Sequence, residues 1–204
     1  MMTEDEVGAV HEAAHAVFAV FGPWTRLAGP VILRGPGHGD VVMATDTDAI
    51  RRSLEADSGF DRDLPRIHLV RALLAGPIAE RLLAQRGRAA LSEDDLSDSS
   101  QGDYAVVAEQ LGALRPPRPD LLARLERDVR WRLEQPSVWS AVERFAAILL
   151  DRRSLEAVEA SAILEAMGPV DLSSAEGRSR GWRARLLALI PMARRAVRRN
   201  RQWD

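Results

Sequence analysis

The stretch that decides the fold lies near the amino terminus and has the sequence TEDEVGAVHEAAHAVFAVF, residues 3–21. Thr3, with Glu6 three residues later, has the pattern of a capping box, which marks the start of a helix. The apolar side chains that recur behind it at helical spacing are Val7, Val10, Ala14, Val17 and Phe18. A Gly-Pro pair at residues 22–23 then stops the pattern. The sequence therefore predicts a helix over residues 4–21.

This predicted helix contains the motif HEAAH at residues 11–15. Residues four apart lie on the same helix face, so His11 and His15 can point imidazole nitrogens at one ion. Glu12 lies beside the pair and can reach a metal-bound water. The zincin helix has this arrangement, with two His residues binding zinc and the Glu acting as general base. The alternative is a surface helix with two solvated His side chains and an exposed Glu.

A catalytic zinc ion needs a third protein ligand and an open fourth position. The chain has no Cys and only four His, so the remaining donors are imidazoles and carboxylates. His38 lies in a Gly-rich turn and His68 on an otherwise apolar helix face, and we expect a structural role for each. The third ligand therefore stays open at this point among the remaining His, Asp and Glu residues.

The rest of the chain predicts a mainly α, zincin-like domain over residues 1–170 with one small β-hairpin. The hairpin is expected from two apolar runs, residues 31–33 and 40–45, around a Gly- and Pro-rich turn. A polar, acidic loop is expected over residues 86–100. The expected further helices are residues 48–56, 65–85 with an interruption at Gly76-Pro77, 102–111, 120–135, 138–152, and a short last one from Ser154 to about residue 168.

The composition changes over residues 171–204, which we interpret as a linker and a basic amphipathic tail. If the tail forms a basic amphipathic helix, it can lie on an anionic membrane surface or bind nucleic acid, or it can pack its Leu face on the domain. A formal net charge of −2 gives no general attraction to nucleic acid, so we expect no such partner and keep peripheral membrane contact open. The acidic amino terminus is unlike a signal peptide, so we expect a cytoplasmic protein. The oligomeric state stays open.

Several segments, taken in order, resemble the peptidase domain of FtsH-type AAA+ proteases. HEAAHAV at residues 11–17 is similar to that family's HEAGHA helix, and the hairpin at residues 31–45 to the strand pair that follows it. LAGPIAER at residues 74–81 resembles a GGRAAEE-type helix. DSSQGDYAVVA at residues 98–108 resembles the TGASNDIxxAT segment. LLDRRSL at residues 149–155 resembles a late LLERETL-type stretch, so the likeness extends over residues 4–167.

The resemblance implies that Asp103, at the start of a helix, is the third zinc ligand. Asp98 is the alternative if the acidic loop aligns differently, and helix N-terminal charge placement is another explanation of Asp103. Glu80 matches a family Glu near the site and could orient a ligand His, or be a plain surface Glu. The strand at residues 40–45 is implied to bind an extended substrate by edge pairing. Tyr104 either adds a hydrogen bond at the site or packs in the core.

The sequence also departs from the family. Ala14 replaces the Gly of HEAGH, and SSQG at residues 99–102 replaces GASN. No GxxxxGK[ST] motif of an ATPase module occurs in the sequence, and we expect the family's N-terminal membrane anchor to be absent. We therefore expect a stand-alone, ATP-independent zinc endopeptidase that hydrolyses peptides or flexible protein segments. The alternative is a non-catalytic binding module with the same fold.

Overall fold

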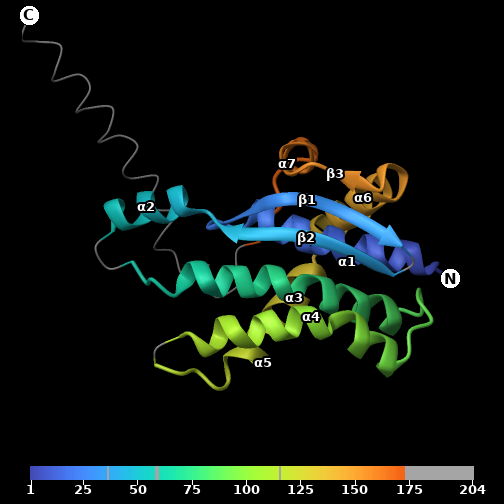
Figure 1. Ribbon diagram of the computed structural model, residues 1–204, viewed down its shortest axis with the longest axis horizontal. Coiled ribbons are helices and arrows are strands. Elements are labelled where there is room, and N and C mark those ends of the chain that lie inside the picture. Colours follow the sequence, from blue (N-terminus) through green and yellow to red (C-terminus); the bar gives the residue numbers. More distant parts are fainter. Residues whose placement is uncertain (36, 58–59, 115, 173–204) are drawn as a thin grey trace, which may run out of the picture. The chain divides into compact units, whose positions relative to one another are not determined.

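The computed structural model describes residues 1–35, 37–57, 60–114 and 116–172, and Figure 1 shows their helices and strands. In chain order the elements are α1 (Glu4–Phe21), β1 (Thr25–Gly35), β2 (His38–Thr45), α2 (Thr47–Ala56), α3 (Leu64–Gln85), α4 (Glu93–Gly112), α5 (Leu121–Leu133), α6 (Pro136–Arg152), β3 (Ser154–Leu155) and α7 (Ala157–Ala166). The predicted mainly α fold with a small sheet is thus confirmed.

Helix α1 lies in the core of the described domain. Its start is fixed by the predicted capping box, because the Thr3 hydroxyl accepts from the Glu6 amide and the Glu6 carboxylate accepts from the Thr3 amide. Residues 7–19 are all buried, and α1 packs against α3, α6 and β1. The expectation of a solvated surface helix as the alternative for HEAAH is therefore wrong.

The sheet is antiparallel, with β1 between β2 and β3. The predicted hairpin is confirmed, with Val31 opposite Val41, and β1 is longer than predicted. The expectation that Ser154 begins a helix is wrong, because Ser154–Leu155 pairs with β1 as β3. The physical reason lies at Arg153, whose left-handed backbone (φ 62°) ends α6, and whose carbonyl accepts from the Leu33 amide at 2.8 Å.

Helix α3 runs without a break through Gly76-Pro77, so the predicted interruption is wrong. Pro77 has no N–H, and this removes one intrahelical hydrogen bond, to the carbonyl of residue 73. Packing compensates for that loss, because residues 72–80 are all buried and α3 contacts α1, α4 and α5. The helix therefore continues on tertiary contacts where local propensity would end it.

Helix α4 begins at Glu93, within the stretch expected to be a loop. Its first turn has its own capping box, in which the Ser92 hydroxyl accepts from the Asp95 amide and the Asp95 carboxylate accepts from the Ser92 amide. The acidic residues that suggested a solvated loop instead lie at the positive end of the helix dipole. Asp103 consequently lies in the middle of α4, which corrects its expected position at a helix start and removes the explanation by N-terminal charge placement.

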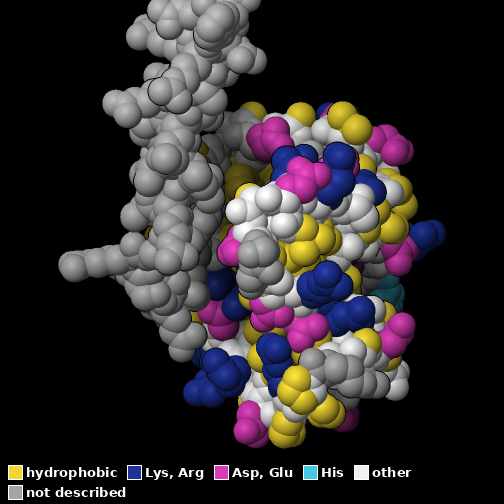
Figure 2. All heavy atoms as spheres, turned by 90° about the vertical axis from the view of Figure 1, so that its left-hand side faces the viewer, with side chains coloured by type: hydrophobic (Ala, Val, Ile, Leu, Met, Phe, Trp, Pro, Cys, Tyr) yellow, Lys and Arg dark blue, Asp and Glu magenta, His cyan; other side chains and the backbone are white. Residues whose placement is uncertain are grey.

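Helices α2, α5 and α6 lie close to their predicted positions, and Met1–Leu172 forms one compact unit. Among the described residues, no helix has both the length and the apolar character that crossing a membrane requires. Figure 2 shows one face of the molecule, where Arg, Asp and Glu side chains are interspersed with apolar ones. The predicted basic tail falls on residues 173–204, outside the described residues, so its proposed contacts and the boundary at residue 170 stay predictions.

Candidate metal centre

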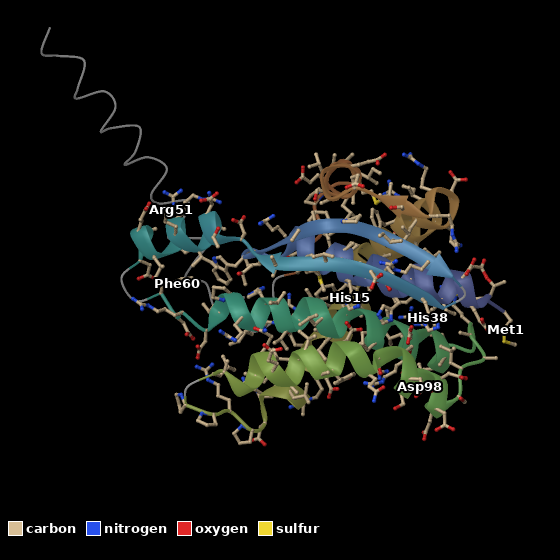
Figure 3. All side chains as sticks on the ribbon, in the orientation of Figure 1. Met1, His15, His38, Arg51, Phe60 and Asp98 are labelled. Atoms are coloured by element: carbon tan, nitrogen blue, oxygen red, sulfur yellow. The ribbon has the colours of Figure 1, made fainter. Side chains whose placement is uncertain are left out.

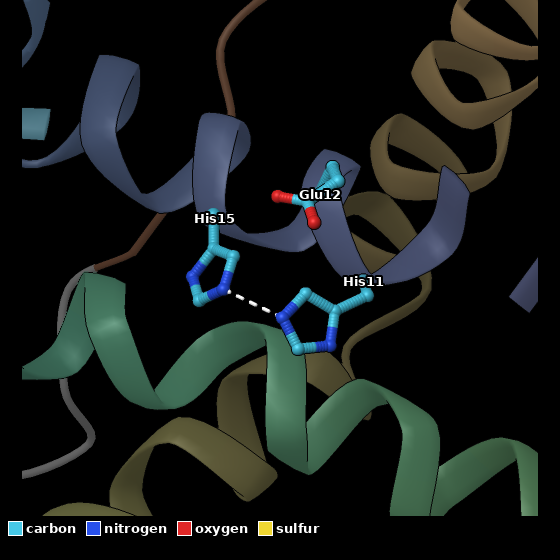
Figure 4. Close-up of side chains that lie close together, drawn as sticks. All are labelled: His11, Glu12 and His15. Atoms are coloured by element: carbon cyan, nitrogen blue, oxygen red, sulfur yellow. Dashed lines mark hydrogen bonds between the residues drawn. The ribbon is translucent and has the colours of Figure 1, made fainter. Parts of the chain in front are cut away.

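Three side chains from two helices meet at one point in the core. His11 and His15, one turn apart on α1, have their Nε2 atoms 2.9 Å apart above α3 (Figure 4). Asp103 on α4 places Oδ2 at 3.2 Å from Nε2 of His11 and 3.3 Å from Nε2 of His15. The structure thus brings together the two imidazoles of the HEAAH motif and the carboxylate that the family resemblance implied.

The other nitrogen of each ring determines what the Nε2 atoms can do. His11 Nδ1 lies 2.8 Å from Oε1 of Glu80, and His15 Nδ1 lies 2.7 Å from the carbonyl oxygen of Ala72. A backbone carbonyl can only accept and an ionised carboxylate can only accept, so each Nδ1 carries a hydrogen and donates it. In the neutral rings the Nε2 lone pairs then face each other and Asp103. Three such acceptors are stable side by side when a cation lies among them.

The spacing of these atoms fits zinc. In a regular tetrahedron two ligand atoms are about 1.6 bond lengths apart, which is about 3.3–3.4 Å for zinc bonds of about 2.0–2.1 Å. The observed separations between His11, His15 and Asp103 are 2.9, 3.2 and 3.3 Å. Nitrogen and oxygen donors also suit zinc. The donor types and separations of His11, His15 and Asp103 are therefore compatible with three ligands of a zinc site.

The electrostatics of the cluster favour positive charge. Burial by itself lowers the pKa of His11, but the protonated ring donates to both Asp103 and Glu80, and these hydrogen bonds outweigh burial and raise that pKa well above its ordinary value. Burial by itself raises the pKa of Asp103, but His15 and His11 outweigh it and hold the pKa of Asp103 well below its ordinary value. A field that stabilises a proton between these groups also stabilises a metal cation.

The Glu12 side chain lies beside the two imidazoles and against strand β2. It is 5% exposed, and one ligand atom each of His11, Glu12 and His15 lie within 4.8 Å of one another. Burial raises the pKa of Glu12, against the opposing influence of the two imidazoles. A side chain at Gly39 of β2 would place its Cβ 2.7 Å from Glu12 Oε1, so this strand runs directly against the carboxylate.

A second layer of hydrogen bonds holds His11 in place. Glu80 is 2% exposed, so the expectation of a plain surface Glu is wrong. Its Oε1 accepts from His11, and its Oε2 accepts from the Ser99 hydroxyl at 2.6 Å. Ser99 and Asp103 are four residues apart on α4 and therefore share a face. The role of Ser99 is not predictable from the sequence if residues 86–100 form a loop, because the four-residue spacing to Asp103 has meaning only within a helix.

Asp98 and the two remaining His residues lie elsewhere. Asp98 is exposed on α4, and His38 is exposed at the start of β2 (Figure 3). His68 is half-buried on α3, with its ring centre 4.9 Å from that of Trp24 and its Nε2 accepting from Arg71 at 3.1 Å. Burial and nearby guanidinium groups lower the pKa of His68 to about 3. The structure therefore places Asp103, and not Asp98, beside the imidazoles.

Tyr104 belongs to a different polar cluster from Asp103. Its hydroxyl donates to Oε1 of Glu126 on α5 at 2.6 Å and accepts from Arg81 at 2.8 Å. Burial, followed by the bond to Glu126, raises the pKa of Tyr104 to about 12. The hydroxyl is thus committed to a contact between α3, α4 and α5 and not to the metal centre.

Comparison with known proteins adds no family to this geometry. No protein-family model matches the chain, and no curated protein matches it. The resemblance to FtsH-type peptidase domains therefore stays a prediction that rests on the HEAAH helix and the segments that follow it.

Proposed function

We propose that this chain is a zinc-dependent metalloendopeptidase of the HExxH type that cleaves peptides or flexible protein segments without ATP. The observation that carries the proposal is the triangle of Nε2 of His11, Nε2 of His15 and Oδ2 of Asp103, with separations near those of a tetrahedral zinc site. The proposal includes the cytoplasmic location expected from the sequence.

The roles of the residues follow from their positions. His11, His15 and Asp103 would hold the ion, which when bound supplies a Lewis acid that lowers the pKa of a water and polarises a peptide carbonyl. Glu12 takes a proton from the attacking water on its carboxylate and passes it to the leaving amine. Glu80 keeps the hydrogen of His11 on Nδ1, so that the Nε2 lone pair stays directed at the site.

Strand β2 supports an extended peptide as the substrate class. Within the described sheet β2 is an edge strand with β1 as its neighbour, so its outer N–H and C=O groups can pair with an added strand. Gly39 of β2 lies against Glu12, and pairing there brings a peptide backbone to the general base. An extended pose requires unfolded chain, so we expect peptides and flexible segments to be cleaved and compact domains to be spared.

The test is digestion of casein or a fluorogenic peptide in zinc-containing buffer without nucleotide. Glu12→Gln keeps the size of the side chain and removes its basicity, and we expect it to lower kcat by at least about a hundredfold. Glu109→Gln, an exposed change on α4, is the matched control and should retain full activity. Equal cleavage by the wild type and Glu12→Gln would contradict the mechanism. Zinc binding without cleavage by the wild type would favour the non-catalytic binding module.

A further inference from the structure

Gly76, in the middle of α3, lies directly beneath the point where the two imidazoles meet. A Cβ at this position would lie 2.4 Å from Nε2 of His15 and 2.5 Å from Nε2 of His11. Non-bonded carbon and nitrogen atoms do not approach this closely. The three heavy atoms nearest to that Cβ all belong to these two rings. Only a hydrogen atom therefore fits between α3 and the candidate metal-binding nitrogens.

A left-handed backbone does not explain the choice of Gly at position 76. The described glycines with positive φ are Gly37, Gly87 and Gly168, and Gly76 is not among them. In a helix interior Gly is less favourable than Ala, so its presence needs a steric reason. The ring of Pro77 crowds a Cβ on the preceding helical residue, and the two imidazoles stand closer still to that position. The absence of a side chain is therefore what this position requires.

The rings above Gly76 are not free to move away. Their Nδ1 atoms are bound to Ala72 and Glu80, which lie one turn before and one turn after Gly76 on the same helix. Each ring is thus anchored at its outer nitrogen and directs its inner nitrogen over Gly76. A methyl group at position 76 would have to break one of these anchors or push α3 away from α1.

We propose that Gly76 is a positioning residue, whose missing side chain creates the space in which the metal-binding nitrogens converge. The inference rests on the proposed zinc site and adds to it that α3 shapes the site as a template. Ala72 and Glu80 orient the two imidazoles, and Gly76 leaves room for them. Gly76→Ala then weakens metal binding although all three ligand residues are retained.

The direct test measures metal binding by the full chain. Wild type, Gly76→Ala and Gly102→Ala are titrated with Zn²⁺, and with Co²⁺, whose visible absorption reports tetrahedral coordination. Gly102 lies in α4 beside Asp103, and a Cβ there meets no atom within 4 Å, so it is the matched control. We expect one zinc per chain in the wild type and in Gly102→Ala, and at least a tenfold weaker affinity with a lost or altered Co²⁺ spectrum in Gly76→Ala.

The two hypotheses fail in different ways. A wild type that binds no zinc overturns the proposed function. Zinc affinity and Co²⁺ spectra that are equal in the wild type and in Gly76→Ala overturn the role of Gly76 and leave the proposed function standing.

A second measurement separates the clash from a general folding defect. Gly76→Ala is also made in a background with both His11→Ala and His15→Ala, where the atoms that would clash are gone. We expect Gly76→Ala to lower the melting temperature of the wild type by clearly more than that of the double-Ala background, where only the crowding against Pro77 remains. An equal loss in both backgrounds, or failure to fold in both, would show a packing role independent of the imidazoles and overturn the inference.

Discussion

Two histidine clusters contact the same helix, α3, and have opposite electrostatic character. At the middle of α3, His11 is hydrogen-bonded to Asp103 and Glu80, and its pKa is raised well above the ordinary value despite burial. Near the beginning of α3, His68 is half-buried beside Arg71, and burial together with the guanidinium charge lowers its pKa to about 3. A buried imidazole among carboxylates thus favours a cation, and one among guanidinium groups stays neutral.

The comparison shows what makes a His residue a metal-ligand candidate in this protein. Burial is common to both clusters and therefore does not distinguish them. The first cluster has two carboxylates on one imidazole, whereas the second has Asp128 shared between Arg71 and Arg132, at 2.7 and 3.0 Å. The carboxylate of the second cluster is already neutralised, so that cluster offers a cation no free negative charge.

The largest expected effect comes from removing the carboxylate that completes the first cluster. Asp103→Asn keeps the shape of the side chain and removes its charge. We expect zinc affinity to fall by more than about a hundredfold, because loss of a ligand costs more than the roughly 10–100-fold typical of losing a residue that only hydrogen-bonds to a ligand. Isothermal titration with Zn²⁺ measures the change. Asp98→Asn, an exposed change on the same helix, should bind zinc like the wild type. The reverse result would make Asp98 the ligand.

A smaller effect is expected from the residue that orients His11. Glu80→Gln weakens the acceptor of the His11 Nδ1 hydrogen, and we expect zinc affinity to fall by about 10–100-fold. Ser99→Ala removes only the hydrogen bond to Glu80 and should lower zinc affinity less.

Asp128→Asn in the second cluster should lower the melting temperature without changing zinc affinity. Weaker zinc binding by Asp128→Asn would show that the two clusters are coupled, and it would contradict the view that only the first cluster binds a cation.

The smallest expected effect is on the pH dependence of stability, through His68. Its pKa is about 3 in the folded chain and about 6.5 when unfolded, so between these pH values the unfolded state binds one more proton. The free energy of unfolding therefore falls as pH drops below about 6.5, by up to about 1.4 kcal/mol per pH unit from this residue. Urea unfolding between pH 7 and 5 should show a steeper loss for the wild type than for His68→Gln. Parallel curves would refute the assignment.

The sequence predicted the elements whose signals are local. The capping box at Thr3, the helical spacing up to Phe18 and the hairpin around the Gly-rich turn all depend on hydrogen bonds and side-chain periods within a few residues. The placement of Asp103 came from resemblance and not from such a signal. The start of α4 was missed although its capping box at Ser92 is equally local, because the acidic first turn was taken as a solvated loop.

The i, i+4 spacing of His11 and His15 was set by the sequence alone, because a helix of any origin puts these residues on one face. Which atoms complete their surroundings was decided only by tertiary packing. The Ala72 carbonyl, Gly76 and Glu80 meet the imidazoles because α3 packs on α1 across more than fifty residues of chain. Backbone carbonyls and the room beside a glycine have no pattern of their own in the sequence, and helix–helix packing alone determines where they lie. The packing of α3 on α1 therefore determined the space and the negative charge around the imidazoles, which the HEAAH motif does not specify.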